Sequence, residues 1–132
     1  MQQAVSEGGT LLDILWRVFV MQLEIIEDDH EMRALMELAL FKTGMIPELE
    51  RGRQQRIDSG VALIEMLTGI MRQGMEQGLL RPDVDPKEMA RAYLAFQNGL
   101  INLWLTAPEQ FSLKASAESF ADILMAGIQN QE

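Results

Sequence analysis

The stretch YLAFQNGLINLWLTAP, residues 93–108, decides how this sequence folds. It is almost wholly apolar and stops at Pro108, and its spacing predicts a helix that starts at Pro86, behind the capping residue Asp85. At about 100° per residue its polar side chains fall on one narrow stripe, and the apolar arc covers well over half of the circumference. A helix with so wide an apolar surface has to be buried on more than one side. One side would pack in the chain's own core, and a second copy of the chain could cover the other.

In the middle of this helix, Gln97, Asn98 and Gly99 divide between its two surfaces. Asn98 joins Asn102 on the polar stripe, which we expect on the outer or dimer side, whereas Gln97 lies among apolar neighbours. A buried amide without a partner costs about 1–3 kcal/mol, so Gln97 requires a partner, a water molecule or a ligand. Gln22 has the same character on an earlier predicted helix. The two amides are compatible with a ligand cavity that has a few polar groups, and also with bonds to nearby backbone or solvent.

The remaining segments repeat the helical period, so the predicted fold class is all-α. Capping residues, glycines and prolines predict the other helices over 11–26, 29–43, 47–77 and 113–129. Glycines inside the segment 47–77 predict that this helix is kinked or broken. The last helix has an apolar seam that suits packing against another helix, and it consists of Leu113, Ala117, Phe120, Leu124 and Ile128.

Composition bounds the class of protein. The chain has 132 residues, 48% of them hydrophobic, which suits one globular domain with one core. It has no cysteine, which excludes disulfides and fits a reducing cytoplasm. The net charge of −9 predicts poor binding to nucleic acid, because duplex binding needs lysines and arginines that neutralise phosphates. Charges interrupt the longest apolar run, so we expect no membrane span and no signal peptide.

Patterns that would indicate catalysis or a cofactor are not found in the sequence. The single histidine, His30, stands in the run EDDHE, but residues this close at a helix start do not converge on one metal ion. No second histidine or cysteine offers a zinc site or a catalytic triad, and no glycine-rich loop matches a phosphate-binding fingerprint. We therefore expect no enzyme, no metal and no cofactor.

Three stretches carry a resemblance to a known family. LMELALFKTG (35–44), RQQR near the start of a long helix (53–56) and GLLRPDVDPKEMARAYLAFQNGLINLWLTAPEQFSL (78–113) resemble the C-terminal half of TetR-family transcriptional repressors. The branch that controls multidrug efflux pumps in Gram-negative bacteria is the most similar. The most specific features of the match are the pair Gly99–Leu100, Trp104, Pro108 and Leu113.

The resemblance implies a bundle of five or six helices, whose last two form a four-helix bundle in a homodimer. Residues 1–10 would be a flexible N-terminal segment, and 11–132 a cytoplasmic ligand-binding and dimerisation domain. DNA would be bound only through a helix-turn-helix domain that has no room in this chain. The bound effector would be a hydrophobic or aromatic small molecule, and relief of repression would control an efflux system.

The resemblance also assigns residues. It places the ligand pocket at Phe19, Leu23, Met36, Leu40, Val61, Leu94, Gln97 and Ile101. Together with the helical pattern, it places the dimer interface at Asn98, Asn102, Leu113, Ala117, Phe120 and Leu124. The alternative is a homodimeric protein–protein interaction module without a pocket. A cavity of roughly 300–1,000 Å³ between the first four helices would distinguish the two hypotheses.

Overall fold

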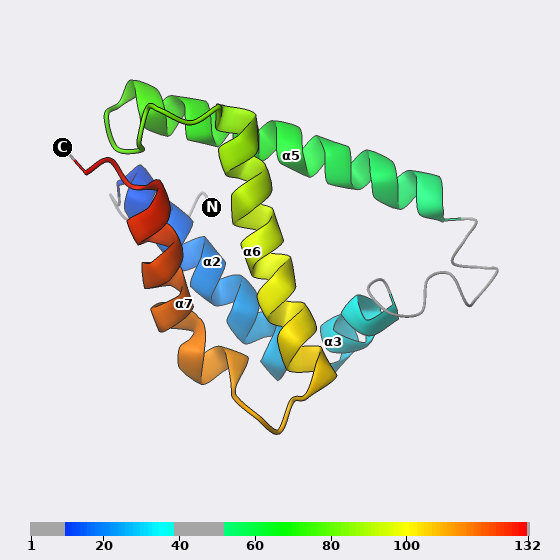
Figure 1. Ribbon diagram of the computed structural model, residues 1–132. Helices are drawn as coiled ribbons and strands as arrows, with labels where there is room; N and C mark the ends of the chain where they lie inside the picture. Colours follow the sequence, from blue (N-terminus) through cyan, green and yellow to red (C-terminus); the bar gives the residue numbers. More distant parts are fainter. Residues whose placement is uncertain (1–9, 39–51, 132) are drawn as a thin grey trace.

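The computed structural model describes residues 10–38 and 52–131. Within these ranges the elements are all helices: α2 (Leu11–Asp28), α3 (His30–Glu37), α5 (Arg53–Glu76), α6 (Pro86–Thr106) and α7 (Leu113–Ile128) (Figure 1). The all-α class is therefore confirmed. None of these described helices combines the length and the hydropathy needed to cross a bilayer.

Capping groups fix the starts of α2, α6 and α7 where the sequence predicted them. Thr10 and Asp13 form a reciprocal capping box, with N–H to side-chain oxygen distances of 3.2 and 3.3 Å. Asp85 accepts a backbone N–H in the first turn of α6 at 2.7 Å, and Ser112 accepts one in α7 at 3.0 Å. Such caps satisfy backbone donors that have no partner inside the helix.

The helix α3 differs from its prediction at its N-terminus. It begins at His30, one residue later than predicted, because Asp29 is its cap: the Asp29 carboxylate accepts the N–H groups of Glu31 and Met32 at 3.0 and 3.2 Å. The helix is described as far as Glu37. The remainder of the predicted segment, 39–43, and the predicted start of the next helix at Pro47 lie outside the described residues.

The long helix α5 continues from Arg53 to Glu76 without interruption, so the predicted kink or break at its glycines is wrong. Gly60 and Gly69 have open space where a Cβ atom would lie, and the helix simply continues through them. Gly74 is different, because a Cβ there would lie 2.5 Å from Cδ1 of Leu80. Its lack of a side chain lets the turn after α5 return against the helix.

The core lies where α2 and α7 pack against each other and against the pair α5–α6. Phe19 of α2 is fully buried, and its ring centroid lies 5.7 Å from Tyr93 and 5.8 Å from Phe96. The Tyr93 hydroxyl donates to the backbone carbonyl of Leu15 at 3.3 Å. Burying a side chain such as Phe19 stabilises the fold by about 1.5–3 kcal/mol.

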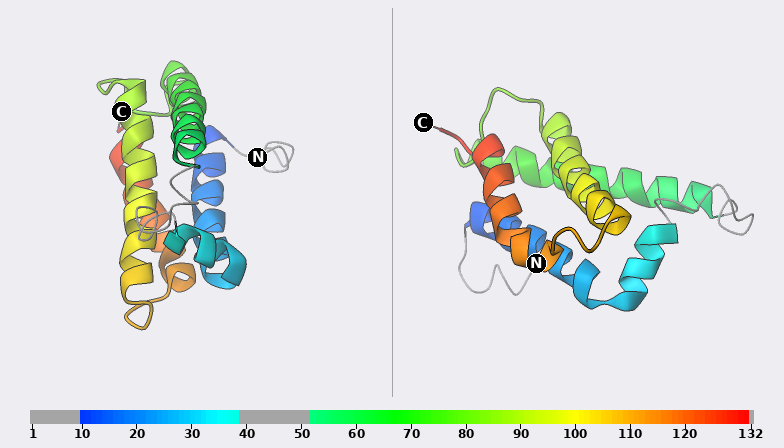
Figure 2. Two further views of the ribbon diagram at one scale, coloured as in Figure 1. Left: turned by 90° about the vertical axis from the view of Figure 1, so that its right-hand side faces the viewer. Right: turned by 60° about the horizontal axis from the view of Figure 1, so that its bottom comes forward.

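The first half of α5 projects beyond α6, as Figure 1 and the right-hand view of Figure 2 show. Its apolar side chains there, Ile57, Val61, Leu63 and Met66, are exposed. The buried apolar side chains of this helix therefore lie in its second half, from Leu67 onward. At the other end, backbone hydrogen bonds join Arg81 to Ile128 (2.9 Å) and tie the turn after α5 to the end of α7.

Candidate ligand-binding site

A hollow of about 300 Å³ lies between α2, α3, α5 and α6, and we call it the four-helix pocket. Its lining residues are Gln22, Ile25, Ile26, Met32, Met36, Leu63, Leu94, Gln97, Asn98 and Ile101. Seven of these residues are apolar, and the three polar ones are amides. Its volume is at the lower end of the range of about 300–1,000 Å³ that small-molecule sites occupy. A concave apolar surface with a few fixed polar groups is typical of such sites.

Helical spacing explains which side chains reach the pocket. Residues three and four positions apart share one face of a helix, so each helix contributes a short ladder of side chains. The ladder of α6 consists of Leu94, Gln97, Asn98 and Ile101. Those of α2 and α3 consist of Gln22, Ile25 and Ile26, and of Met32 and Met36. The pocket is therefore built from regular helical faces rather than from loops.

The two glutamines that stood out in the sequence meet in this pocket. Gln97 Nε2 donates a hydrogen bond to Gln22 Oε1. Gln97 is buried among apolar side chains, whereas Gln22 is exposed at the edge of the pocket. Each amide has two N–H donors and a carbonyl oxygen with two lone pairs, and the bond between them uses only part of that capacity. The partner of Gln97 is thus another side chain, which the sequence pattern alone did not identify.

Arg33 anchors α3 beside the pocket. Its guanidinium carbon lies 4.6 Å from the ring centroid of Trp104, and Nη2 donates to the backbone carbonyl of Glu27 at 2.9 Å. A cation over an aromatic face contributes about 0.5–2 kcal/mol, depending on its exposure. These contacts hold α3 against α2 and α6, and so they position Met32 and Met36.

Half of the residues assigned to the pocket by resemblance line it: Met36, Leu94, Gln97 and Ile101. Phe19 and Leu23 do not, because both are fully buried in the core. Val61 is 57% exposed and lines a separate groove on the outer side of α5 and α6. Leu40 lies outside the described residues.

Several lining residues were not among those assigned to the pocket: Gln22, Ile25, Ile26, Met32, Leu63 and Asn98. Gln22 had a signal in the sequence, since it was a lone amide on an apolar face. Asn98 was expected on the dimer side; it is exposed in the single chain and also lines the pocket. It reaches the pocket because it follows Leu94 by one helical turn.

The residues assigned to the dimer interface on α7 are mostly buried in the single chain. Leu113 and Ala117 are fully buried, and Leu124 is nearly so, within the single chain. In the single chain, most of the α7 seam therefore faces its own core. Phe120 is half-buried, and its ring packs edge to face on Phe111 at 6.1 Å.

On α6 the outer face remains open. Asn102 is exposed there and lines a hollow of about 460 Å³ with Gly99 and Leu103. Leu103 is 64% exposed, and Ile123 on α7 is 58% exposed. These two large apolar side chains are the ones on the last two helices that solvent reaches most readily.

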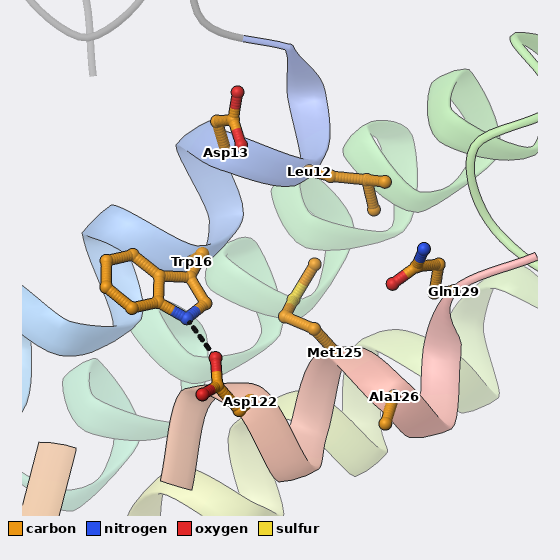
Figure 3. Close-up of a pocket in the computed structure, with 7 residues that line it drawn as sticks. All are labelled: Leu12, Asp13, Trp16, Asp122, Met125, Ala126 and Gln129. Atoms are coloured by element: carbon orange, nitrogen blue, oxygen red, sulfur yellow. Dashed lines mark hydrogen bonds between the residues drawn. The ribbon is translucent and has the colours of Figure 1, made fainter. Parts of the chain in front are cut away.

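Another hollow, of about 440 Å³, lies between the first turns of α2 and the last turns of α7 (Figure 3). There Trp16 Nε1 donates to Asp122 Oδ1 at 2.8 Å, and Asp13 already belongs to the capping box of α2. Because the bond between Trp16 and Asp122 holds the two helices together there, we assign this hollow a structural role. The described residues contain no group of three or more histidine or carboxylate side chains placed to hold a metal ion.

Comparison with known proteins places this geometry in a family. The family model for the C-terminal region of MAATS-type transcriptional repressors, in the TetR group, matches residues 11–129. The sequence is similar to the HTH-type transcriptional regulator AcrR of Shigella flexneri, with 24% identity over 117 residues, 89% of this chain and 54% of that protein. It is also similar to the fatty acid metabolism regulator protein of Bacillus subtilis (strain 168), with 21% identity over 131 residues, 99% of this chain and 65% of that protein.

Solved structures share the fold. The repressor NalD of the MexAB-OprM multidrug efflux pump in Pseudomonas aeruginosa superposes with a TM-score of 0.82 at 19% identity, over 96% of this chain and 64% of that one. FadR of Bacillus subtilis, in complex with stearoyl-CoA, gives a TM-score of 0.71 at 17% identity, over 96% and 66%. The chain spans between about half and two thirds of the length of these relatives. Because the family model covers all five described helices, the chain belongs to the TetR family, as the C-terminal region of a MAATS-type transcriptional repressor.

Proposed function

We propose that this chain is the effector-sensing and dimerisation domain of a TetR-family regulator, and that a hydrophobic or aromatic small molecule binds in the four-helix pocket. One observation carries the proposal. An apolar hollow of about 300 Å³, with a hydrogen-bonded amide pair in its wall, lies between the first four described helices. A pocket of this size and lining supports a ligand-binding domain over an interaction module without a pocket.

The relatives support the class of ligand. NalD represses a multidrug efflux pump, and the FadR structure contains stearoyl-CoA, whose acyl chain is long and apolar. We propose that this chain acts in the cytoplasm. Binding of its effector would relieve repression of an efflux system. Specific DNA binding would come from a helix-turn-helix domain distinct from the helices described above.

The helix α6 offers a route from the pocket to the dimer. Gln97 and Asn98 line the pocket, while Gly99 and Asn102 lie on the outer face of the same helix. A ligand that moves α6 would therefore change the surface that we propose meets the second protomer. Binding would favour a dimer geometry in which the two DNA-reading domains no longer match the spacing of the operator half-sites.

A matched pair of variants tests the pocket. Met36→Trp places a large ring in the pocket wall, and Met66→Trp places the same ring on an exposed part of α5 outside the pocket. Fluorescent-dye displacement and thermal shift with a panel of hydrophobic drugs should show saturable binding to the unmodified chain and to Met66→Trp. Met36→Trp should bind about tenfold more weakly or not at all.

The competing hypothesis is a homodimeric interaction module that binds no small molecule. It is favoured by the exposed apolar side chains of the outer helices, of which Leu103 and Ile123 are the largest on α6 and α7. An unmodified chain that binds no compound of the panel, or a Met36→Trp variant that binds as well as the unmodified chain, would support this alternative.

A further inference from the structure

We propose that the four-helix pocket selects uncharged ligands with one hydrogen-bonding group, such as an alcohol, a ketone or an amide, over carboxylates and ammonium ions of the same length. This inference rests on the proposed function and specifies its ligand class. Its basis is the chemistry of the pocket wall. No described lining residue is charged, and the polar ones are Gln22, Gln97 and Asn98.

The amide side chains of the pocket wall can bind a neutral polar group that is either a hydrogen-bond donor or an acceptor. Each amide presents both donors and an acceptor, so a hydroxyl, a carbonyl or an amide of the ligand finds a complementary atom. An ion does not find its opposite charge there. An ion that enters the pocket without a paired charge loses its hydration, and the amide dipoles of the wall replace that hydration only in part. A neutral ligand loses less hydration and is therefore favoured.

On the α5–α6 side, two cations lie close to the pocket, and each is paired with a carboxylate. Leu94 is shared with the adjacent groove, which contains Lys87 and Arg91. Lys87 Nζ lies 2.9 Å from Glu65, and Arg91 Nη1 lies 2.7 Å from a Glu88 carboxylate oxygen. The Lys87 hydrogen bond holds the pKa of Glu65 below its usual value, so this pair stays ionised. Both cations therefore already face a carboxylate, and neither brings an uncompensated positive charge to the pocket.

On the α2–α3 side most of the neighbouring charges are acidic. Ile25 is shared with a hollow that also contains His30 and the carboxylates Glu24, Asp28, Asp29 and Glu31. Asp28 pairs with Lys114 at 2.9 Å, and Asp29 caps α3. Arg33, the cation on this side, is stacked on Trp104. Attraction of a ligand cation to these surface carboxylates decays over a Debye length of about 8 Å at physiological ionic strength, so from greater distances it does not compensate for burial in the pocket.

Three ligands of equal length test the inference: 1-octanol, octanoate and octylammonium, at neutral pH. Their affinities are measured by calorimetry and by displacement of a dye already shown to bind the pocket. The unmodified chain should bind 1-octanol at least about tenfold more tightly than either ion, a difference of about 1.4 kcal/mol. Octanol is also the least hydrated of the three, so variants are needed to separate the pocket from general partitioning.

Gln22→Glu supplies that separation. Residue 22 lines the pocket but is exposed, so the new carboxylate stays ionised, and it can still accept the hydrogen bond from Gln97. Gln73→Glu makes the same change in net charge at an exposed site of α5 outside the pocket. Relative to Gln73→Glu, Gln22→Glu should improve the affinity for octylammonium against 1-octanol by about tenfold.

The outcomes distinguish the inference from the function on which it rests. If either ion binds the unmodified chain as tightly as 1-octanol, or if both variants shift the preference equally, the selectivity is not a property of this pocket. If the drug panel binds but 1-octanol does not, the inference fails and the proposed function stands. If neither the panel nor any of the three ligands binds, the proposed function itself fails.

Discussion

At the scale of single residues, Gln97 is the buried polar group of the pocket, and its replacement by leucine is informative. Gln97→Leu removes the amide and keeps a similar volume. Its partner Gln22 is exposed and can hydrate, so the change should alter the free energy of unfolding by less than about 1 kcal/mol. Affinity for compounds with a matching polar group should fall by about 1 kcal/mol or more, while purely apolar compounds bind as well or better.

Calorimetry with two compounds that differ only in one hydroxyl checks this prediction. Equal losses for both compounds would mean that Gln97 acts on the shape of the pocket and does not read the ligand. Gln110→Leu, at an exposed position in the turn before α7, is the matched control and should leave both affinities unchanged.

Tyr93 predicts a dependence of stability on alkaline pH. Burial raises the pKa of its phenol from 10.0 to about 12. The folded state therefore keeps the proton at pH values where the unfolded state has lost it. The stabilisation is complete below pH 10.0 and is lost as the pH rises towards about 12.

Tyr93→Phe should remove this part of the pH dependence. Denaturant unfolding at a series of alkaline pH values measures it, as the difference between the two proteins. The variant should lose only about 0.5–1.5 kcal/mol at neutral pH, since the hydroxyl makes one long bond, of 3.3 Å, to the Leu15 carbonyl. Parallel profiles for the two proteins between pH 10.0 and about 12 would contradict the assignment.

At the scale of elements, capping side chains in the sequence predicted where most of the helices start. Thr10 with Asp13, Asp85 with Pro86, and Ser112 each combine a capping side chain with a following apolar period, and each begins a helix in the structure. The glycines of α5 misled the prediction. A glycine costs only about 0.5–1 kcal/mol in a helix, which the packing of Leu67 and Met71 offsets.

We expect Ser112 to contribute to stability at this scale, because it caps α7 and also joins α7 to α2. Its hydroxyl accepts the Ala115 N–H at 3.0 Å and donates to the Glu27 carboxylate at 2.8–2.9 Å. Ser112→Ala should lower the free energy of unfolding by about 1–2 kcal/mol, as loss of a cap does. Ser119→Ala, on the exposed side of α7, is the control and should change it by less than about 0.5 kcal/mol. Equal midpoints of urea unfolding for the two variants would show that the cap contributes nothing.

The candidate site was harder to predict than the helices that form it. Helical period identifies an apolar face, but it does not say which part of that face meets the core and which part meets a hollow. Phe19 and Leu23 therefore appeared as pocket residues, although they are fully buried in the core. Val61 failed for another reason, since α5 projects beyond the bundle and carries this residue into solvent. The Gln22–Gln97 bond joins two helices far apart in sequence, which no local pattern encodes.

At the scale of the whole molecule, α6 has one face in the core and pocket and another that the single chain leaves open. Its wide apolar arc predicted two buried sides, and Leu103 on the open side is 64% exposed. The sequence could not say which residues of α7 would accompany it. The seam at Leu113, Ala117 and Leu124 has helix-packing spacing, but spacing does not distinguish the chain's own core from a partner's surface.

The exposed apolar residues of the last two helices make the prediction about assembly. We expect the unmodified chain to be a dimer at micromolar concentration, with Leu103 and Ile123 in the interface. The double variant Leu103→Glu, Ile123→Glu should sediment as a monomer and keep its helical circular dichroism, because both side chains are exposed in the single chain. Leu124→Glu should instead unfold the protein, since Leu124 is buried in the core.

Val61→Glu is the control for added charge at an exposed position, because Val61 is 57% exposed on the projecting half of α5. This substitution should leave the dimer intact. Sedimentation velocity of the unmodified chain, the double variant and this control separates the possibilities. A monomeric unmodified chain would exclude a stable dimer of this domain. A dimeric double variant would place the interface elsewhere and would contradict the proposed role of α6 as the connection between the pocket and the second protomer.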